Sequence, residues 1–403
     1  MKLPLLLEPL RHRDFRLLWT GQTVSVFGDF MHGVALPFQL LALGATPVQL
    51  GLGVSISIAV QLVLILFGGA IVDRLPRRRI ILASDLLSGI AVTLVGTLSI
   101  AGLLRIEYVY LEAAFFGATA AFFMPAMGAI IPELVPSDVL VQGNTLRGFS
   151  RQAARLGGPV LGGILVAGPG PGWALIADGV TFFVSFVALS AARPAGGAPK
   201  PRRPLLHEIR EGIAFTFSVG WLWITIALFA LVNASFTGPM SVGLPLLVRD
   251  VLRADARAFG LITAAGGVGE IVGGLFVGQV RLRRIGIAMY LFAAAGGLGV
   301  MTFGLFPRLP IVLLASVGIG VSFVGFGVLW ESAVQRNVPR ELLGRVGSVD
   351  WFGSLLLGPV SPLVVGAIVQ SVGPAAVFTV AGALAAALCL GALLVPSIRD
   401  LRG

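Results

Sequence analysis

The sequence predicts an all-α integral membrane protein with twelve transmembrane helices in two pseudo-symmetric six-helix bundles. Three observations lead to this fold class: the apolar composition, the number of apolar segments, and a repeat that relates the two halves of the chain. Of the 403 residues, 56% are hydrophobic and only 12% are charged, whereas about a quarter of the residues in a soluble domain are charged. A soluble domain cannot bury so much apolar surface. The composition therefore excludes a soluble enzyme and a nucleic-acid-binding domain.

Twelve apolar segments reach the ~20 residues that cross the hydrocarbon core of a bilayer. In the first half these segments are 16–42, 48–72, 79–103, 107–131, 143–167 and 172–192. In the second half they are 219–247, 259–280, 285–306, 309–331, 347–370 and 374–396. The fifth segment is the weakest candidate, because Arg147, Arg151 and Arg155 lie in its first half.

The basic residues are distributed unequally between the two sides of the predicted membrane. The net charge is +10, and 24 of the 29 Lys and Arg residues lie on the side of the termini and the even-numbered loops, if the three arginines of the fifth segment are counted there. Because cytoplasmic loops are enriched in Lys and Arg, we expect both termini in the cytoplasm. This asymmetry accounts for the positive charge without nucleic acid as a partner. A single cysteine, Cys389, excludes an internal disulfide.

The two halves of the chain repeat each other. Residues 67–80, FGGAIVDRLPRRRI, resemble residues 272–285, VGGLFVGQVRLRRI, and GGPV at 157–160 resembles LGPV at 357–360. A repeat at nearly constant spacing predicts a duplicated six-helix unit in parallel topology. The segment between the two halves is Pro-rich and basic at its start and amphipathic towards its end. We therefore predict an N-terminal bundle at 1–192, a cytoplasmic linker at 193–218 and a C-terminal bundle at 219–403.

Two duplicated bundles joined by a basic loop are typical of secondary transporters, whose halves rock about a site between them. The sequence has no phosphate-binding GxxxxGK[ST] loop and no HxxxH or DDxxD run. We therefore expect neither an enzyme, a cofactor nor a metal site. The alternative from another functional class is a membrane enzyme or sensor. The sequence contains no set of catalytic residues that supports this alternative.

The loop after the second predicted span carries a recognisable motif. Gly69, Asp73, Arg74, Arg77 and Arg78 resemble the G-x-x-x-D-R-x-x-R-R signature of the major facilitator superfamily. Gly28-Asp29 with Ala35-Leu36-Pro37, Asp85, Pro125 with the prolines at 132 and 136, and Asp178 look like its branch of macrolide-efflux and enterobactin-exporter-like proteins. That resemblance implies a bacterial inner-membrane exporter of small amphipathic compounds, commonly driven by proton antiport. We expect a monomer whose partners are the substrate, protons and the lipid bilayer. A lysophospholipid or metabolite carrier of the same fold remains the alternative.

The resemblance also implies two motifs that act in the conformational change. Asp73 would accept hydrogen bonds from the N-terminus of span eleven, near residues 346–351, and so latch the two halves. The alternative is a plain topology signal, for which the arginines of the motif suffice. Four residues of the fifth span fit the core of the antiporter motif: Gly158, Pro159, Gly162 and Gly163.

The first predicted span carries a polar face made of Gln22, Ser25, Asp29, His32 and Gln39. Asp29 lies roughly 20 Å from the cytoplasmic end, at 1.5 Å per residue. Intramembrane carboxylates usually mark an ion or substrate path, and histidine exchanges protons near neutral pH. We therefore expect Asp29 and His32 to take part in proton coupling. Asp29 and the other three residues are also expected to line the substrate cavity. A permanent structural ion pair is the alternative.

Three further acidic residues lie within predicted spans. Glu112 and Asp178 are candidates for a proton path, or are simply paired, and Glu270 is also a candidate for proton coupling. Glu270 matches Arg155 in depth, and the family resemblance places spans five and eight together. We therefore expect Arg155 and Glu270 to form an ion pair between the halves. Arg147 and Arg151 share the face of Arg155, and for both we favour snorkelling to the cytoplasmic interface.

The second half supplies two weaker candidates for the cavity wall. Asn233, Thr237 and Ser241 share a helix face and would line the cavity, with hydrogen bonding between helices as an equal alternative. Phe323 and Phe326 could line an apolar drug pocket, although lipid contact or core packing is the favoured role for such residues.

Overall fold

The computed structural model describes residues 5–72, 75–192, 205–279 and 284–401. These residues form helices and short connections, and none of them lies in a strand. The chain divides into two compact units. The N-terminal unit comprises residues 1–46, 52–200 and 255–264, and the C-terminal unit comprises 47–51, 201–254 and 265–403.

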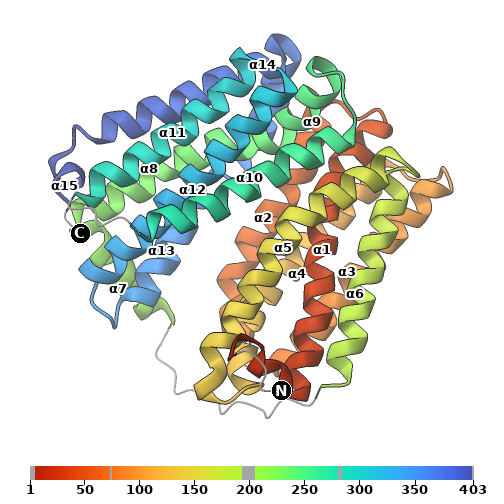
Figure 1. Ribbon diagram of the computed structural model, residues 1–403, viewed down its shortest axis with the longest axis horizontal. Helices are drawn as coiled ribbons and strands as arrows, with labels where there is room; N and C mark the ends of the chain where they lie inside the picture. Colours follow the sequence, from red (N-terminus) through yellow and green to blue (C-terminus); the bar gives the residue numbers. More distant parts are fainter. Residues whose placement is uncertain (1–4, 73–74, 193–204, 280–283, 402–403) are drawn as a thin grey trace. The chain divides into compact units, whose positions relative to one another are not determined.

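Six long helices follow one another in the first half of the chain (Figure 1). They are α1 (Arg13–Ala42), α2 (Pro47–Val72), α3 (Arg77–Ile100), α4 (Ile106–Ile130), α5 (Leu140–Ala167) and α6 (Pro171–Ser190). Short 3-10 turns precede α1 and connect α4 to α5: η1 (Leu5–Arg11), η2 (Ile131–Glu133) and η3 (Ser137–Val139).

Helix α1 packs against both α5 and α6, and α3 packs against α4 and α6. Glycines allow these close approaches, as is common between membrane helices. A Cβ atom on Gly21 would lie 2.9 Å from Cβ of Ala188 in α6. On the α5 side, a Cβ atom on Gly158 would lie 2.5 Å from Cβ of Phe30. Helix α1 is thus closely packed between α5 and α6.

The second half contains the amphipathic helix α7 (Leu205–Ser218) and the remaining long helices. These are α8 (Gly220–Gly238), α10 (Ala256–Val277), α11 (Ile285–Leu305), α12 (Leu309–Asn337), α13 (Leu343–Leu355) and α14 (Val360–Ala392), with the short α15 (Pro396–Arg399) at the end. Helix α11 packs against α12 and α14, and α14 packs against α8. The core between them is aromatic, with the Phe229 and Phe326 rings stacked 3.9 Å apart.

The seventh predicted span continues beyond α8 through two π-helical turns, η4 (Pro239–Gly243) and η5 (Leu247–Val251), separated by α9 (Leu244–Leu246). Pro239 cannot donate a backbone hydrogen bond, and such positions often widen a helix. Next to this proline, Ser361 of α14 enters the α8 backbone ladder. Its hydroxyl accepts from Gly238 N at 2.9 Å and donates to Ala234 O at 2.5 Å. The side chain thus bridges two backbone groups of α8 one turn before the π-helical segment.

Ten helices in the described part of the chain are long and apolar enough to cross a membrane. Two features account for the difference from the twelve predicted spans. Helix α5 is a continuous 28-residue helix, but its three arginines lower its apolar character. Residues Leu343–Ala392 count as one segment, although Gly373, with φ 78° and ψ 160°, breaks α14 immediately before Pro374. The count of twelve spans is therefore not fully confirmed.

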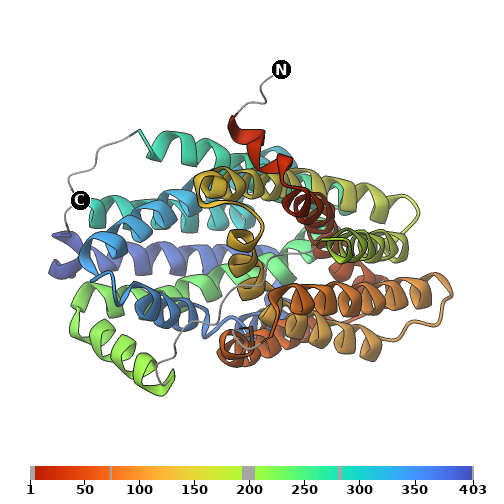
Figure 2. The same cartoon turned by 90° about the horizontal axis from the view of Figure 1, so that it is seen from below.

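Helix α7 occupies part of the predicted linker and packs against α13 and α8 within the C-terminal unit (Figure 2). Arg345 of α13 forms an ion pair with Glu211 of α7. A Cβ atom on Gly212 would lie 3.0 Å from Cβ of Arg345. Residues 193–204 of the linker lie outside the described residues. The predicted boundaries of the linker and the two bundles stay predictions.

Candidate functional site

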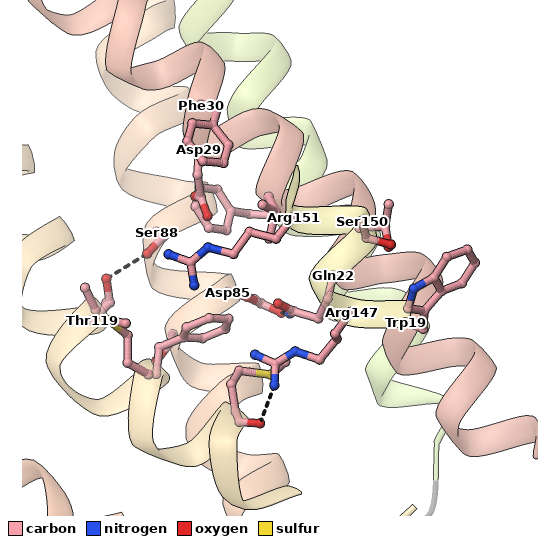
Figure 3. Close-up of a pocket in the computed structure, with 18 of the residues that line it drawn as sticks. Trp19, Gln22, Asp29, Phe30, Asp85, Ser88, Thr119, Arg147, Ser150 and Arg151 are labelled. Atoms are coloured by element: carbon pink, nitrogen blue, oxygen red, sulfur yellow. Dashed lines mark hydrogen bonds between the residues drawn. The ribbon is translucent and has the colours of Figure 1, made fainter. Parts of the chain in front are cut away.

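The N-terminal unit contains a cavity of about 510 Å³ between α1, α3, α4 and α5 (Figure 3). Its polar wall includes Gln22 and Asp29 of α1, Asp85 of α3, and Arg147 and Arg151 of α5. Its apolar wall is formed mainly by α4 and by aromatic residues, including Phe116, Phe123, Met124, Met127, Phe30 and Phe182. A cavity of this size suits a small organic ligand, since ligand sites usually measure ~300–1,000 Å³.

A buried hydrogen-bond network joins α1, α3 and α6 at this cavity. Ser185 donates to Asp85 Oδ2 at 2.7 Å, and Gln22 Nε2 donates to Ser185 Oγ at 2.7 Å. Gln22 Nε2 also lies 3.4 Å from Asp85 Oδ2. The second carboxylate oxygen, Asp85 Oδ1, is buried without a hydrogen-bond partner among the described residues. Because an orphaned buried acceptor is costly, this carboxyl is poised to take up a proton or a donor.

A second buried group of titratable side chains lies near the first. His32 Nε2 lies 3.1 Å from Glu112 Oε1, and both side chains are almost fully buried. The imidazole stacks on the Phe116 ring at 4.7 Å, with an angle of 6° between the planes. Asp29 and Asp178 also lie close enough to His32 to interact with it electrostatically. The structure thus gathers on α1, α4 and α6 four titratable residues that sequence analysis had assigned separately to proton coupling.

Two oxygens of this group have unused hydrogen-bonding capacity. Glu112 Oε2 and Asp178 Oδ2 are buried without a partner among the residues that the structure describes. The other Asp178 oxygen is 3.4 Å from Thr181 Oγ1. Leaving such acceptors unpaired inside a membrane costs several kcal/mol each, on the order of the penalty for a lost hydrogen bond in hydrocarbon. Protonation of a carboxyl group would relieve this penalty, so the arrangement can hold and pass a proton.

The two arginines of the cavity point into it from one face of α5 (Figure 3). Arg147 donates a long hydrogen bond of 3.4 Å to Met127 O. Arg151 lies within electrostatic range of Asp29. The sequence-based interpretation of both residues as snorkelling side chains missed this cavity. The i, i+4 spacing with Arg155 indicated a shared face, but no sequence feature indicated that α3 and α4 enclose a space in front of it.

The predicted polar face of α1 divides into two groups. Gln22 and Asp29 line the cavity. Ser25 and Gln39 are buried and do not line it, and Gln39 Oε1 accepts a hydrogen bond of 2.6 Å from Ser99 Oγ of α3. His32 is also buried, next to Glu112. The roles of all five residues in transport stay predictions.

The polar stripe of the seventh span makes hydrogen bonds to backbone. Thr237 and Ser241 donate to carbonyl groups one turn earlier in their own helix, at 2.9 Å and 2.6 Å. Asn233 Nδ2 donates across to Ser354 O at 2.9 Å. These contacts satisfy the side chains locally, and whether they also face substrate stays a prediction.

The two predicted aromatic residues of α12 lie in different surroundings. Phe323 is 65% exposed. Phe326 instead stacks on Phe229 and Trp330 in the core of the C-terminal unit. Their role as a pocket wall stays untested.

The loop motif is described only in part. Gly69 lies in α2, whereas Asp73 and Arg74 lie outside the described residues, so the predicted latch is untested. Arg77 forms an ion pair with Glu133 of η2. Arg78 donates to the carbonyl groups of Leu189 at 3.2 Å and Ser190 at 2.5 Å, at the C-terminal end of α6. A cation there also complements the helix dipole.

The antiporter-type residues lie in the middle of α5. Gly158, Pro159, Gly162 and Gly163 are all buried. A Cβ atom on Gly162 would lie 3.0 Å from both Cα and the carbonyl oxygen of Met31. Gly158 and Gly162 therefore bring α5 against α1 beside the cavity, whereas Gly163 faces Ala256 at the start of α10. A role in coupling stays a prediction.

Arg155 and Glu270 belong to different units of the chain, and their predicted pairing stays a prediction. Glu270 is buried, with 9% of its surface exposed. A double-mutant cycle with Arg155→Gln and Glu270→Gln tests the pairing. If they pair, each single change costs about 3–5 kcal/mol and the double variant recovers part of that loss. Additive losses would rule it out.

Asp85 is the functional candidate that sequence analysis missed, because it was noted only as part of the family resemblance. It lies one residue from Ser84 on the cavity wall, and its side chain is only 1% exposed. A carboxylate in the middle of an apolar segment was the available signal, and it applies to Asp85 as it does to Asp29.

Comparison with known proteins places these features in a family. The profile described as the Major Facilitator Superfamily matches residues 18–360. Enterobactin exporters EntS from Shigella boydii serotype 18 and Escherichia coli O139:H28 are 26% identical over 364 residues, covering 86% of this chain and 85% of each relative.

Solved transporters share the fold at low sequence identity. A bacterial homologue of the iron transporter ferroportin, in an inward-facing state, aligns with a TM-score of 0.69 and 18% identity, over 94% of this chain and 98% of that one. The nucleoside transporter NupG aligns with a TM-score of 0.76 and 11% identity, over 94% and 99% of the two chains. With its repeat, its helical membrane architecture and a profile match over most of its length, the chain belongs to the major facilitator superfamily of multi-pass membrane transporters.

Proposed function

We propose that this transporter exports small amphipathic compounds, of the drug, macrolide or siderophore kind, across the bacterial cytoplasmic membrane in exchange for protons. Export of a siderophore is supported by the similarity to enterobactin exporters at 26% identity. The cytoplasmic position of both termini is supported by the 24 of 29 basic residues on one side. Fusing a fluorescent protein and a periplasmically active phosphatase to the C-terminus tests this topology, since only the first should be active.

One observation carries the proton coupling: a cluster of buried titratable groups lies beside an accessible cavity in the same unit. Asp29 lines the cavity, and it interacts electrostatically with His32, which contacts Glu112. Buried ionisable groups inside a membrane are costly and mark proton or substrate paths. These contacts support a proposed proton route from the cavity through Asp29 to the His32–Glu112 pair.

The proposed coupling depends on whether the Asp29 carboxyl group is ionised or protonated. When Asp29 is ionised, it interacts favourably with both His32 and Arg151. When it is protonated, these interactions weaken, and the neighbouring side chains are free to change partners. A ligand or proton shifts a two-state equilibrium only by the difference in its affinity for the two states. If the cluster has a different proton affinity in each of the two conformations, its protonation shifts the equilibrium between them. Proton binding is then coupled to the alternation of the two halves.

Counterflow in proteoliposomes tests the proposal directly. We would compare erythromycin, enterobactin and lysophosphatidylcholine as radiolabelled compounds, each with and without an imposed pH gradient. The proposal predicts accumulation of erythromycin or enterobactin that increases with the gradient. Accumulation of lysophosphatidylcholine alone, or accumulation that does not depend on the pH gradient, would contradict the proposal. Either result would favour a lipid or metabolite carrier.

A further inference from the structure

We infer that the cavity of the N-terminal unit is a binding site for an organic anion with an aromatic body, held by the guanidinium groups of Arg147 and Arg151. This inference rests on the proposed function, because it names the substrate class of the same transporter. Both side chains line the cavity and point into it (Figure 3). They also lie close enough to each other to repel electrostatically.

The charges of the two guanidiniums are not neutralised by direct ion pairs. No carboxylate in the described part of the chain lies within 4.0 Å of either one. Asp29 interacts with Arg151 only at longer range. Asp85 Oδ2 accepts from Ser185 and Gln22, and Asp85 Oδ1 has no partner among the described residues. Two like charges near each other in a membrane-embedded site favour an anion between them. Arginine suits this role because its planar fork binds a carboxylate or sulfonate through two hydrogen bonds.

Unused donors on α1 extend the same wall of the cavity. Trp19 Nε1 and Thr23 Oγ1 are buried without hydrogen-bond partners among the described residues, and both residues line the cavity. The indole N–H is only a donor, so it needs an acceptor from elsewhere. An anionic or carbonyl oxygen of a bound compound would satisfy it, whereas a cation would not.

The facing wall determines the rest of the ligand. Phe116 and Phe123, with Met124 and Met127 of α4, give an apolar and polarisable surface. Aromatic rings and methionine sulfur pack well against the face or edge of a bound ring. A flat aromatic body with one acidic group would therefore place its ring on α4 and its charge on α5.

The test uses three compounds with the same ring: 2-naphthoate, the neutral 2-naphthalenemethanol and the cationic 2-naphthylmethylammonium. Binding to the full-length protein in nanodiscs is measured by calorimetry, with empty nanodiscs as the control for lipid partitioning. We expect the anion to bind about tenfold or more tightly than the neutral alcohol, the usual effect of one charged hydrogen bond. Equal affinities, or preference for the cation, would overturn the inference without the need for any variant.

Variants then assign the effect to the two arginines. Arg147→Gln and Arg151→Gln should each reduce 2-naphthoate affinity about tenfold or more while leaving 2-naphthalenemethanol binding unchanged. The matched control is Arg105→Gln, at an exposed arginine that precedes α4 and does not line the cavity. Undiminished anion affinity in both cavity variants would overturn the assignment, and the unchanged alcohol affinity shows that each variant is folded.

Failure of the anion site and failure of the proposed function give different experimental results. If the arginines determine anion binding but no compound of the panel responds to a pH gradient in vesicles, proton-coupled export fails and the anion site stands. If a compound of the panel is exported with the gradient, but 2-naphthoate binds no more tightly than the neutral alcohol or binds equally well to the Arg147 and Arg151 variants, the anion site fails and the proposed function stands.

Discussion

A methyl group added at Gly28 should destabilise the N-terminal unit and disturb its proton cluster. Gly28 faces α6, and a Cβ atom built there would collide with Thr181 Oγ1 and Asp178 Oδ1 and lie 3.1 Å from Thr181 Cβ. The Thr181 hydroxyl already donates to Asp178 O at 2.7 Å. Because both side chains are buried, neither can move aside without breaking a contact.

The magnitude follows from two opposing terms. Overpacking in a tightly packed interior costs about 1–3 kcal/mol, whereas replacing a helical glycine by alanine gains about 0.5–1 kcal/mol. Gly28→Ala should therefore lower the free energy of unfolding by up to about 2.5 kcal/mol. Gly33→Ala, one and a half turns later in the same helix, is the matched control, because nothing lies within 4 Å of a Cβ atom built there. It should be neutral or slightly stabilising.

Thermal unfolding in detergent, monitored together with proton-driven export in vesicles, measures both effects. We expect Gly28→Ala to unfold at a lower temperature and to export more slowly than Gly33→Ala. Equal stability of the two variants would refute the close packing of α1 against α6 at this position. Lower stability with normal export would mean that Asp178 can shift without effect on transport.

Four further predictions concern the His32–Glu112 pair, the α8 backbone, the membrane potential and the predicted latch. Glu112→Gln should slow proton-driven export about tenfold or more by removing the charge beside His32, whereas Glu107→Gln at the start of the same helix should not; equal export rates would exclude the pair from coupling. Ser361→Ala should lower the free energy of unfolding by about 1–3 kcal/mol, because Gly238 N and Ala234 O lose their shared partner, and a melting temperature equal to that of wild type would show that the α8 backbone does not depend on it. Exchange of one proton for a monovalent anion moves two charges, so an inside-negative potential of 100 mV in right-side-out vesicles should favour export by about 4–5 kcal/mol, and export rates independent of a valinomycin-set potential would contradict the anionic substrate. Asp73→Asn should shift interhelical distances on the cytoplasmic side toward the inward-open state when measured by double electron-electron resonance, and unchanged distances would exclude the latch.

The fold was predictable from the sequence because the bilayer imposes strong and simple constraints. Each span needs an apolar stretch of fixed length, and the repeat in residues 67–80 and 272–285 showed how the spans are grouped. Local breaks were less predictable. The π-helical turns begin at Pro239, next to backbone groups that bond to Ser361, which is more than a hundred residues away in the sequence.

The candidate site was predictable only as a set of separate residues. A buried acid within an apolar segment is conspicuous, so Asp29, Glu112 and Asp178 could each be identified. Their convergence on His32 depends on how α1, α4 and α6 rotate and pack, which the sequence does not encode locally. For the same reason, Arg147 appeared to be a residue that reaches the membrane interface, whereas the enclosing helices make it part of the cavity wall.

Proton movement during substrate export is the most direct test of the account. Vesicles containing the pH indicator pyranine are reconstituted with wild-type protein or with Asp29→Asn, and an exported compound of the panel is applied as a gradient across the membrane. The account predicts that the wild type moves protons opposite to the substrate, and that Asp29→Asn moves none while it still exchanges labelled for unlabelled substrate. Substrate export without proton movement in the wild type, or equal proton movement in the two proteins, would contradict it.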